Sequence, residues 1–167
     1  MPTIQRRLIV SQGDRRRVCV RGIIYKDGKL FCQQLKKQGG VASDFWCTPG
    51  GGLDPLEPLI DGLKREMIEE TGVAPEIGRL LFIQQYADSA NFSYDEEEQL
   101  EFFFHIKNAD DYETIDESAS HFDAEIFSCE FVDPKTKHVL PKFLRHIDIQ
   151  QYIDTDQSPY IYTEFSR

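Results

Sequence analysis

The chain has 167 residues, of which 40% are hydrophobic, and it carries a formal net charge of −10 at pH 7. This size and apolar content suit one domain with a sizeable core rather than two small domains. The acidic balance disfavours nucleic-acid partners, because nonspecific binding to nucleic acid depends on Lys and Arg neutralising phosphates. The longest apolar runs, at 80–83 and 102–104, are much shorter than the roughly 20 residues that span a bilayer, so we expect no membrane segment and a cytoplasmic location.

Residues 1–14 are read as an N-terminal extension ahead of the first expected strand. Residues 17–35 predict a hairpin, because apolar residues alternate on both sides of Asp27-Gly28, a pair that favours a tight turn. A short strand is expected at 45–48, where Pro49 and the glycines at 50–52 stop it. Glycines in such a loop let the backbone approach a ligand closely.

The region from Pro58 to Gly72 gives the clearest helix signal in the chain. Pro58 suits a first helical position, apolar residues recur at helical spacing, and Gly72 is a natural C-terminal cap. Further strands are expected near 78–86, 100–106 and 125–132, with a second amphipathic helix at 138–147. Interleaved strands and helices predict an α/β fold with a mixed β-sheet.

The last segment, 148–167, is polar but contains several aromatic residues, which is unusual for a disordered tail. We expect it to pack on the domain or on a partner, and its composition is compatible with a homodimer.

Three carboxylates, Glu66, Glu69 and Glu70, fall on one side of the expected helix in its last turns. There they meet the negative end of the helix dipole, and Glu66 and Glu70 repel each other at i, i+4. A hard divalent cation such as Mg²⁺ would reverse this repulsion, because it prefers carboxylate, water and phosphate oxygens. Arg65 could fix one of these carboxylates, or Glu57, by a paired hydrogen bond. The alternative is that this acidic helix end is ordinary solvated surface.

The spacing of these residues is Gly51, five residues, Glu57, seven residues, then 65–73 as Arg-Glu-Met-Ile-Glu-Glu-Thr-Gly-Val. It matches the Nudix box at every defined position, and the chain resembles Nudix hydrolases over about 15–147. The resemblance implies an α/β/α sandwich. It also implies hydrolysis of a nucleoside diphosphate linked to another group X, with Mg²⁺ or Mn²⁺.

By this resemblance, Glu69 and Glu70 are principal metal ligands and the carbonyl of Gly50 is a backbone ligand. Glu66 is a further ligand or the general base. The catalytic set is therefore Glu66, Glu69, Glu70 and Arg65, and Glu57 and Arg65 would orient the ligands.

Many relatives add another acid from a later loop. The candidates here are the glutamates at 97, 98, 101, 113 and 117, of which we favour Glu117 as a further metal ligand. For each of them, plain surface charge is the alternative.

Substrate contacts are expected from Gly51 and Gly52, whose peptide groups can approach phosphate. Trp46 is a candidate for stacking on a base, together with Phe45 and Tyr86, although a Trp beside a strand end more often packs in the core. Arg17, in the run 15–17, is a candidate for a phosphate or sugar contact, and the alternative for this run is a solvated strand edge.

Two other functions remain open from the sequence. One is a catalytically silent nucleotide-binding regulatory domain that keeps only the fold. The other is an isoprenyl diphosphate isomerase, which shares the fold, but its cysteine-bearing signature is missing and Cys47 is a poor substitute. Among substrates, a nucleoside triphosphate and a nucleotide sugar both fit.

Overall fold

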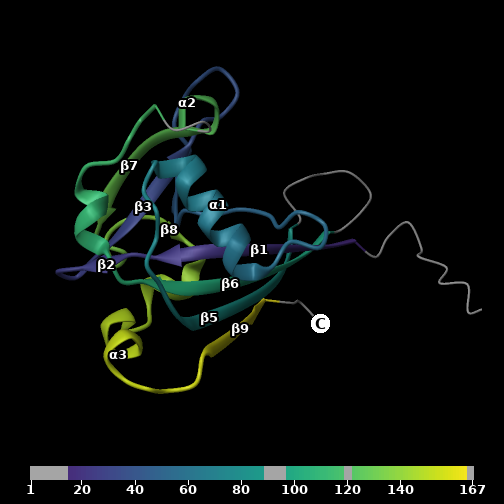
Figure 1. Ribbon diagram of the computed structural model, residues 1–167, viewed down its shortest axis with the longest axis vertical. Helices are drawn as coiled ribbons and strands as arrows, with labels where there is room; N and C mark the ends of the chain where they lie inside the picture. Colours follow the sequence, from purple (N-terminus) through teal and green to yellow (C-terminus); the bar gives the residue numbers. More distant parts are fainter. Residues whose placement is uncertain (1–14, 89–96, 119–121, 165–167) are drawn as a thin grey trace, which may run out of the picture.

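We analysed a computed structural model of the chain, which describes residues 15–88, 97–118 and 122–164 (Figure 1). The expected N-terminal extension at 1–14 lies outside the described residues. Strands are divided between two sheets, both of which mix parallel and antiparallel pairs. The expected α/β class with mixed pairing is therefore confirmed, but with two sheets where we expected one.

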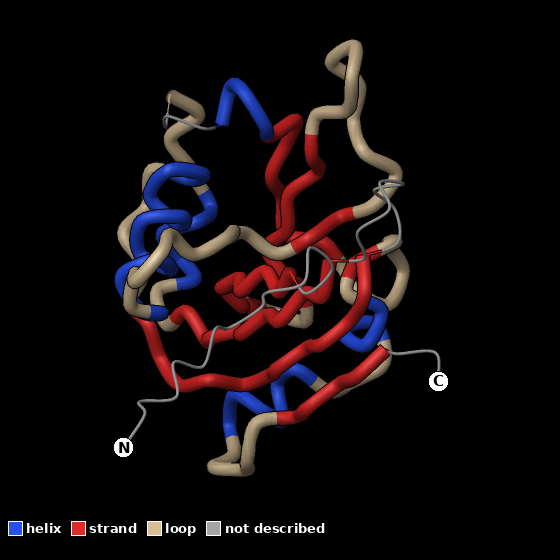
Figure 2. The backbone as a smooth tube through the Cα atoms, turned by 90° about the vertical axis from the view of Figure 1, so that its right-hand side faces the viewer, coloured by secondary structure: helices blue, strands red, loops and turns tan. Residues whose placement is uncertain are grey.

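The first sheet has the strand order β1-β6-β5-β9. Strands β1 (Arg15–Ile23) and β6 (Glu97–Ile106) run parallel, with Cys19 opposite Glu101. Strand β5 (Ile77–Asp88) is antiparallel to β6, and β9 (Tyr160–Glu164) joins β5 in parallel. The chain segment after residue 147 thus supplies an edge strand of the sheet, which Figure 2 shows beside the longer strands.

The second sheet is built around β3 (Lys29–Leu35). Three strands pair with β3 in antiparallel fashion: β2 (Tyr25–Lys26), β4 (Trp46–Cys47) and β7 (Ile126–Val132). Strand β4 also pairs in parallel with β8 (Val139–Leu140). The Asp27-Gly28 turn was predicted correctly, since both residues have positive φ. The hairpin, however, is only β2 and β3, because β1 belongs to the first sheet.

Helix α1 (Leu59–Thr71) was also predicted correctly, with Pro58 just outside it as the N-cap residue. Gly72 is left-handed at φ 72°, and its N–H donates to the Ile68 carbonyl at 2.9 Å. The other face of the glycine is crowded, because an added Cβ would lie 2.5 Å from Cβ of Asp116. The cap therefore depends on glycine for both its dihedral angles and its small size.

The helix expected at 138–147 was wrong. Strand β8 and the 3-10 helix η2 (Lys142–Arg145) occupy this stretch, with Pro141 between them. Proline has no N–H to donate and keeps the preceding residue extended, so an α-helix cannot run through this position. The true helix, α3 (Ile149–Asp154), starts later, where Asp148 caps it by accepting from the Gln151 N–H.

Two hydrophobic clusters lie on opposite sides of the first sheet. Val20, Phe104 and Ile106 pack with Leu63 and Met67 of α1. On the other side, Phe82 and Phe103 contact the second sheet, η2 and α3. The remaining short helices are η1 (Ala109–Glu113) and α2 (Phe122–Glu125). Helix α1 thus packs in one cluster and α3 in the other, and Figure 1 shows α1 in front of β1 and α3 near β5 and β9.

Within the described segments, no helix has the length and apolar character that crossing a membrane requires.

Candidate active site

The glycine loop lies along β1, which fixes its position relative to the sheet. The Val20 N–H donates to the Gly51 carbonyl at 2.9 Å, and the Leu53 N–H donates to the Val18 carbonyl at 3.0 Å. Gly50 has φ 121°, which L side chains rarely adopt, and an added Cβ at this position would collide with the Val20 carbonyl. The sequence Gly50-Gly51-Gly52 therefore allows a tight backbone path between β1 and helix α1.

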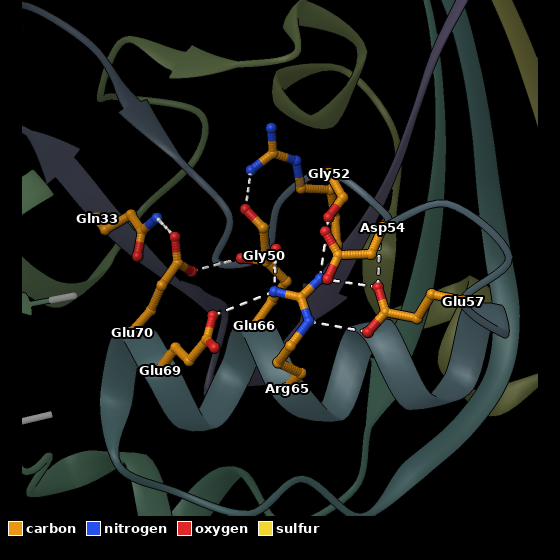
Figure 3. A network of polar contacts seen from close by, with 10 residues as sticks. Gln33, Gly50, Gly52, Asp54, Glu57, Arg65, Glu66, Glu69 and Glu70 are labelled. Atoms are coloured by element: carbon orange, nitrogen blue, oxygen red, sulfur yellow. Dashed lines mark hydrogen bonds and ion pairs between the residues drawn. The ribbon is translucent and has the colours of Figure 1, made fainter. Parts of the chain in front are cut away.

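Arg65 is the centre of the polar network shown in Figure 3. Its Nε and Nη2 each donate to one oxygen of Glu57 at 2.8 Å, and Nη2 also donates to the Gly52 carbonyl at 3.1 Å. Its Nη1 donates to Glu66 at 2.7 Å and to Glu69 at 3.1 Å. The Arg65 guanidinium, with help from the Asp54 N–H, lowers the pKa of Glu57 to about 2. The paired contact expected between Arg65 and Glu57 is thus present.

Glu70 is held differently, because it points into the protein and is only 6% exposed. It accepts from Gln33 Nε2 at 2.9 Å and from the Gly50 N–H at 2.6 Å. Burial raises the pKa of Glu70 to about 7, although both hydrogen bonds act in the opposite direction. Arg65 therefore offsets the predicted repulsion for Glu66 and Glu69. Glu70 is instead penalised by burial, which disfavours its ionised form.

A cavity of about 450 Å³ lies between the two sheets, and Thr48, which precedes the glycine loop, is one of its lining residues. Arg17 and Arg21 of β1 lie on its wall, and the Arg17 guanidinium is 3.1 Å from where a Cβ on Gly52 would sit. Arg21 donates to the Gly50 carbonyl and to Glu101, which is 4% exposed. Arg17 and Arg21 thus connect the glycine loop to this cavity.

The ion pair between Arg21 and Glu101 was missed by the sequence reasoning. The N···O distance is 3.1 Å, and both residues line the cavity. Burial alone would lower the pKa of Arg21, but the Glu101 carboxylate raises it above its usual value. The available signal was alternation, since Arg17, Cys19 and Arg21 share one face of a strand whose other face is apolar.

Trp46 does not line this cavity. Its side chain is 7% exposed and packs in the core cluster between the sheets, while neighbouring Phe45 and Tyr86 lie on the cavity wall. Successive residues of a strand point to opposite faces, so only one residue of the Phe45-Trp46 pair can face the cavity. We therefore withdraw the stacking role for Trp46 and keep Phe45 and Tyr86.

A family model described as NUDIX domain matches residues 15–147. The chain belongs to the Nudix family. Similarity to individual curated Nudix proteins is more local. Diphosphoinositol polyphosphate phosphohydrolase 2 of Homo sapiens is 41% identical over 51 residues, which are 30% of this chain and 28% of that protein. The nucleoside triphosphatase NudI of Enterobacter sp. (strain 638) is 35% identical over 63 residues, or 38% of this chain and 45% of that protein. The chain thus aligns with less than half the length of these relatives.

Solved Nudix structures support the fold over a longer span. The E. coli ORF135 protein superposes with a TM-score of 0.57 and 20% identity, covering 77% of this chain and 83% of its own. A UDP-X diphosphatase superposes with a TM-score of 0.56 and 19% identity, covering 92% of this chain and 70% of its own. These structures share the arrangement of helix and sheets.

Whether the Nudix box residues suit a metal can be judged from their contacts. Across residues 15–88, 97–118 and 122–164, no three acidic, His or Cys side chains converge as a ready-made metal site. Glu66 and Glu69 nevertheless both contact one positive atom, Nη1 of Arg65. The Glu66 carboxylate also fills the space beside Gly51, where an added Cβ would lie 2.5 Å from it. An all-oxygen donor set that already gathers around positive charge fits a hard divalent cation.

Glu117 lies in a turn after η1 and is exposed. The preceding Asp116 donates its N–H to the Thr71 carbonyl at 3.0 Å, which docks this turn on the C-terminal end of α1. Burial is the main cause of the raised pKa of Cys129, and the carboxylates of Glu70 and Glu117 raise this pKa further. Glu117 therefore follows a residue docked on the C-terminal end of α1, and its role as a ligand stays a prediction.

Three of the other candidate acids have partners of their own. Glu98 pairs with Arg16 at 2.7 Å, Glu113 pairs with Lys26, and Glu101 pairs with Arg21. Burial raises the pKa of the Cys47 thiol to about 12, which leaves it protonated and unsuited to the chemistry of an isomerase cysteine.

Proposed function

We propose that this chain is a metal-dependent pyrophosphohydrolase that cleaves a nucleoside diphosphate linked to another group X. The observation that carries the proposal is the gathering of Glu66 and Glu69 around Arg65 while Glu70 contacts the Gly50 N–H. These contacts bring three carboxylates to the glycine loop, which hydrogen bonds hold on β1. Water attacks phosphorus, the bridging P–O bond breaks, and a carboxylate accepts the proton from the water.

Glu66, Glu69, Glu70 and the Gly50 carbonyl would hold Mg²⁺ or Mn²⁺. The ion, when bound, neutralises charge on the diphosphate oxygens and lowers the pKa of a bound water. A donor set of carboxylates combined with substrate phosphate oxygens suits both ions.

Arg65 is the positioning residue of this site. It is locked by two hydrogen bonds to Glu57, and it uses the remaining nitrogen to hold Glu66 and Glu69. A guanidinium remains charged at any working pH, so this restraint does not depend on protonation. The carboxylates are thereby oriented before the substrate arrives.

Arg17 is suited to the diphosphate. Its guanidinium rests against Gly52, and it forms no hydrogen bond or ion pair within the part of the chain that the structure describes. A free guanidinium beside a glycine loop can pair with a phosphate in bidentate fashion. Glu66 and Glu117 are both candidates for the general base.

Two of the three proteins above whose names state a substrate support a nucleoside compound as the substrate. One is called a nucleoside triphosphatase and a structural neighbour is called a UDP-X diphosphatase. Both names describe compounds with a nucleoside joined to a diphosphate, and we assign this chain the same general class.

A hydrolysis assay tests the proposal. The purified chain is incubated with nucleoside triphosphates, dinucleoside polyphosphates and nucleotide sugars in Mg²⁺, Mn²⁺ or chelator, and release of phosphate or nucleoside monophosphate is measured. We expect turnover of at least one compound, dependent on the metal and lost in Glu69→Gln. Exposed Glu76→Gln is the matched control. A folded chain that turns over none of these compounds would refute the proposal.

A further inference from the structure

The peptide bond between Gly50 and Gly51 has a glycine on each side. No Cβ hinders its rotation, so local sterics alone do not fix the direction of the Gly50 carbonyl. Main-chain contacts hold the carbonyls before and after it. The preceding carbonyl, of Pro49, accepts from the Gly22 N–H at 2.9 Å. The following carbonyl, of Gly51, accepts from the Val20 N–H at 2.9 Å. The Gly50 carbonyl, between these two anchored groups, is held by a side chain.

Arg21 of β1 supplies that side chain. Its Nη1 donates to the Gly50 carbonyl, and its Nε donates to Oε1 of Glu101 on β6 at 3.1 Å. Its Nη2 lies 3.1 Å from the same carboxylate oxygen. Because Glu101 is only 4% exposed, the guanidinium is anchored by a buried carboxylate at one edge and contacts the glycine loop with the other.

The N–H of Gly50 is held from a different direction. It donates to Glu70 at 2.6 Å, and Glu70 accepts in turn from Gln33 at 2.9 Å. Figure 3 shows this part of the network, from Gln33 through Glu70 to Gly50. One glycine thus joins two sets of contacts, of which one leads to helix α1 and β3 and the other to β1 and β6.

A buried ion pair is a weak source of stability, because taking two charges out of water costs about as much as their attraction contributes. Apolar side chains of similar volume often stabilise a protein equally well. The pair of Arg21 and Glu101 is therefore better explained by the position that it imposes on Gly50 than by a contribution to folding. The Glu101 carboxylate also balances the guanidinium, so this hydrogen bond adds no net positive charge beside the Nudix box.

We propose that Arg21, anchored by Glu101, is a second positioning residue, which fixes the direction of the Gly50 carbonyl for a bound divalent cation. The inference rests on the proposed function, in which this carbonyl is one of the groups that hold the ion. A carbonyl oxygen has two lone pairs, and the bond from Arg21 uses one of them. The other is left for the cation. Residues that bond to metal ligands in this way commonly affect metal affinity about 10- to 100-fold.

Mn²⁺ binding to the metal-free chain tests this role without any substrate. Free Mn²⁺ is measured by electron paramagnetic resonance during a titration, and the binding that Glu69→Gln removes defines the Nudix box site. Glu101→Gln should weaken binding at this site about 10- to 100-fold. Arg21→Met together with Glu101→Leu should weaken it similarly. This double variant removes both charges at once and leaves neither unpaired in the interior, and thermal unfolding establishes that each variant is folded.

A second measurement reports on the carbonyl itself. The carbonyl carbon of Gly50 is observed by NMR through the Gly51 amide in the metal-free chain, and it should move upfield in both variants because its hydrogen bond is lost. Glu98→Gln is the matched control, since Glu98 pairs with Arg16 at 2.7 Å across the same two strands, where the Arg16 side chain is 56% exposed. It should leave the Gly50 signal in place and change Mn²⁺ affinity less than twofold.

Three outcomes would overturn the inference: folded variants that bind Mn²⁺ as the unaltered chain does, a Gly50 signal that stays in place in them, or a control that weakens binding equally. Hydrolysis separates this inference from the proposed function. Mn²⁺ affinity that depends on Arg21 and Glu101, in a chain that hydrolyses nothing, would support the positioning role and refute the hydrolase proposal. Hydrolysis together with Mn²⁺ affinity independent of this pair would do the reverse.

Discussion

Replacing Glu70 by glutamine removes a carboxyl group whose burial raises its pKa from 4.5 to about 7. One pKa unit corresponds to about 1.36 kcal/mol, so keeping Glu70 ionised in the metal-free fold costs about 3 kcal/mol. The folded state binds more protons than the unfolded state between these two pKa values. Its stability therefore falls as pH rises from 4.5 to 7, and the penalty is complete above pH 7.

Urea unfolding in the presence of a chelator measures this effect directly. The free energy of unfolding of Glu70→Gln, relative to the unaltered chain, should rise by about 3 kcal/mol between pH 4.5 and pH 8.5. The carboxyl group offers two oxygens, one to Gln33 and one to the Gly50 N–H, whereas the glutamine amide offers only one, which subtracts about 1 kcal/mol. The variant is thus slightly destabilised in acid and stabilised in alkali.

Glu76→Gln serves as the control, because Glu76 is exposed and lies outside the network. The comparison separates the effect of burying a carboxyl group from the general effect of replacing a glutamate by glutamine. A pH-independent difference for Glu70→Gln, or a clear loss of stability at pH 8.5, would show that burial does not penalise this carboxylate. The reasoning on the cation-free site would then fail.

Three further changes test other parts of the structure. Glu69→Gln should lower the hydrolysis rate by several orders of magnitude with little change in the free energy of unfolding of the metal-free chain. A marked loss of that stability would instead show that Glu69 has a structural role. Gly72→Ala should cost about 1 kcal/mol for the left-handed cap, and more because of Asp116, as measured by urea unfolding; a cost near zero would contradict the cap. Cys47, with a pKa of about 12, should react with iodoacetamide at pH 8 far more slowly than a small thiol, and fast labelling of the folded chain would contradict its burial.

The sequence was most informative where function and local geometry depend on the same residues. Gly72 was predicted as a cap and is one, and the Asp27-Gly28 turn has the expected positive φ values. Arg65 was expected to hold Glu57 or a carboxylate of the helix, and it holds both kinds. These are contacts between residues close in sequence, for which spacing along a helix or a turn is sufficient information.

Predictions that depended on distant partners were weaker. Nothing local reveals that Arg21 meets Glu101, because that pair requires β1 and β6 to run side by side in parallel. Trp46 could not be distinguished from Phe45 without knowing which strand face the core covers. The prediction of a helix at 138–147 was wrong for a local reason. The apolar spacing of this stretch suits a helix, but Pro141 interrupts it.

The edge strand β9 has a consequence for how this protein can be altered. Its residue Glu164 lines the cavity and bonds to Lys142 at 2.9 Å, yet it lies beyond the segment 15–147 that matches the family. Helix α1 and the glycine loop at 50–52 both lie within that segment. Exchanging the last strand would therefore alter one wall of the cavity while leaving helix α1 and the glycine loop unchanged.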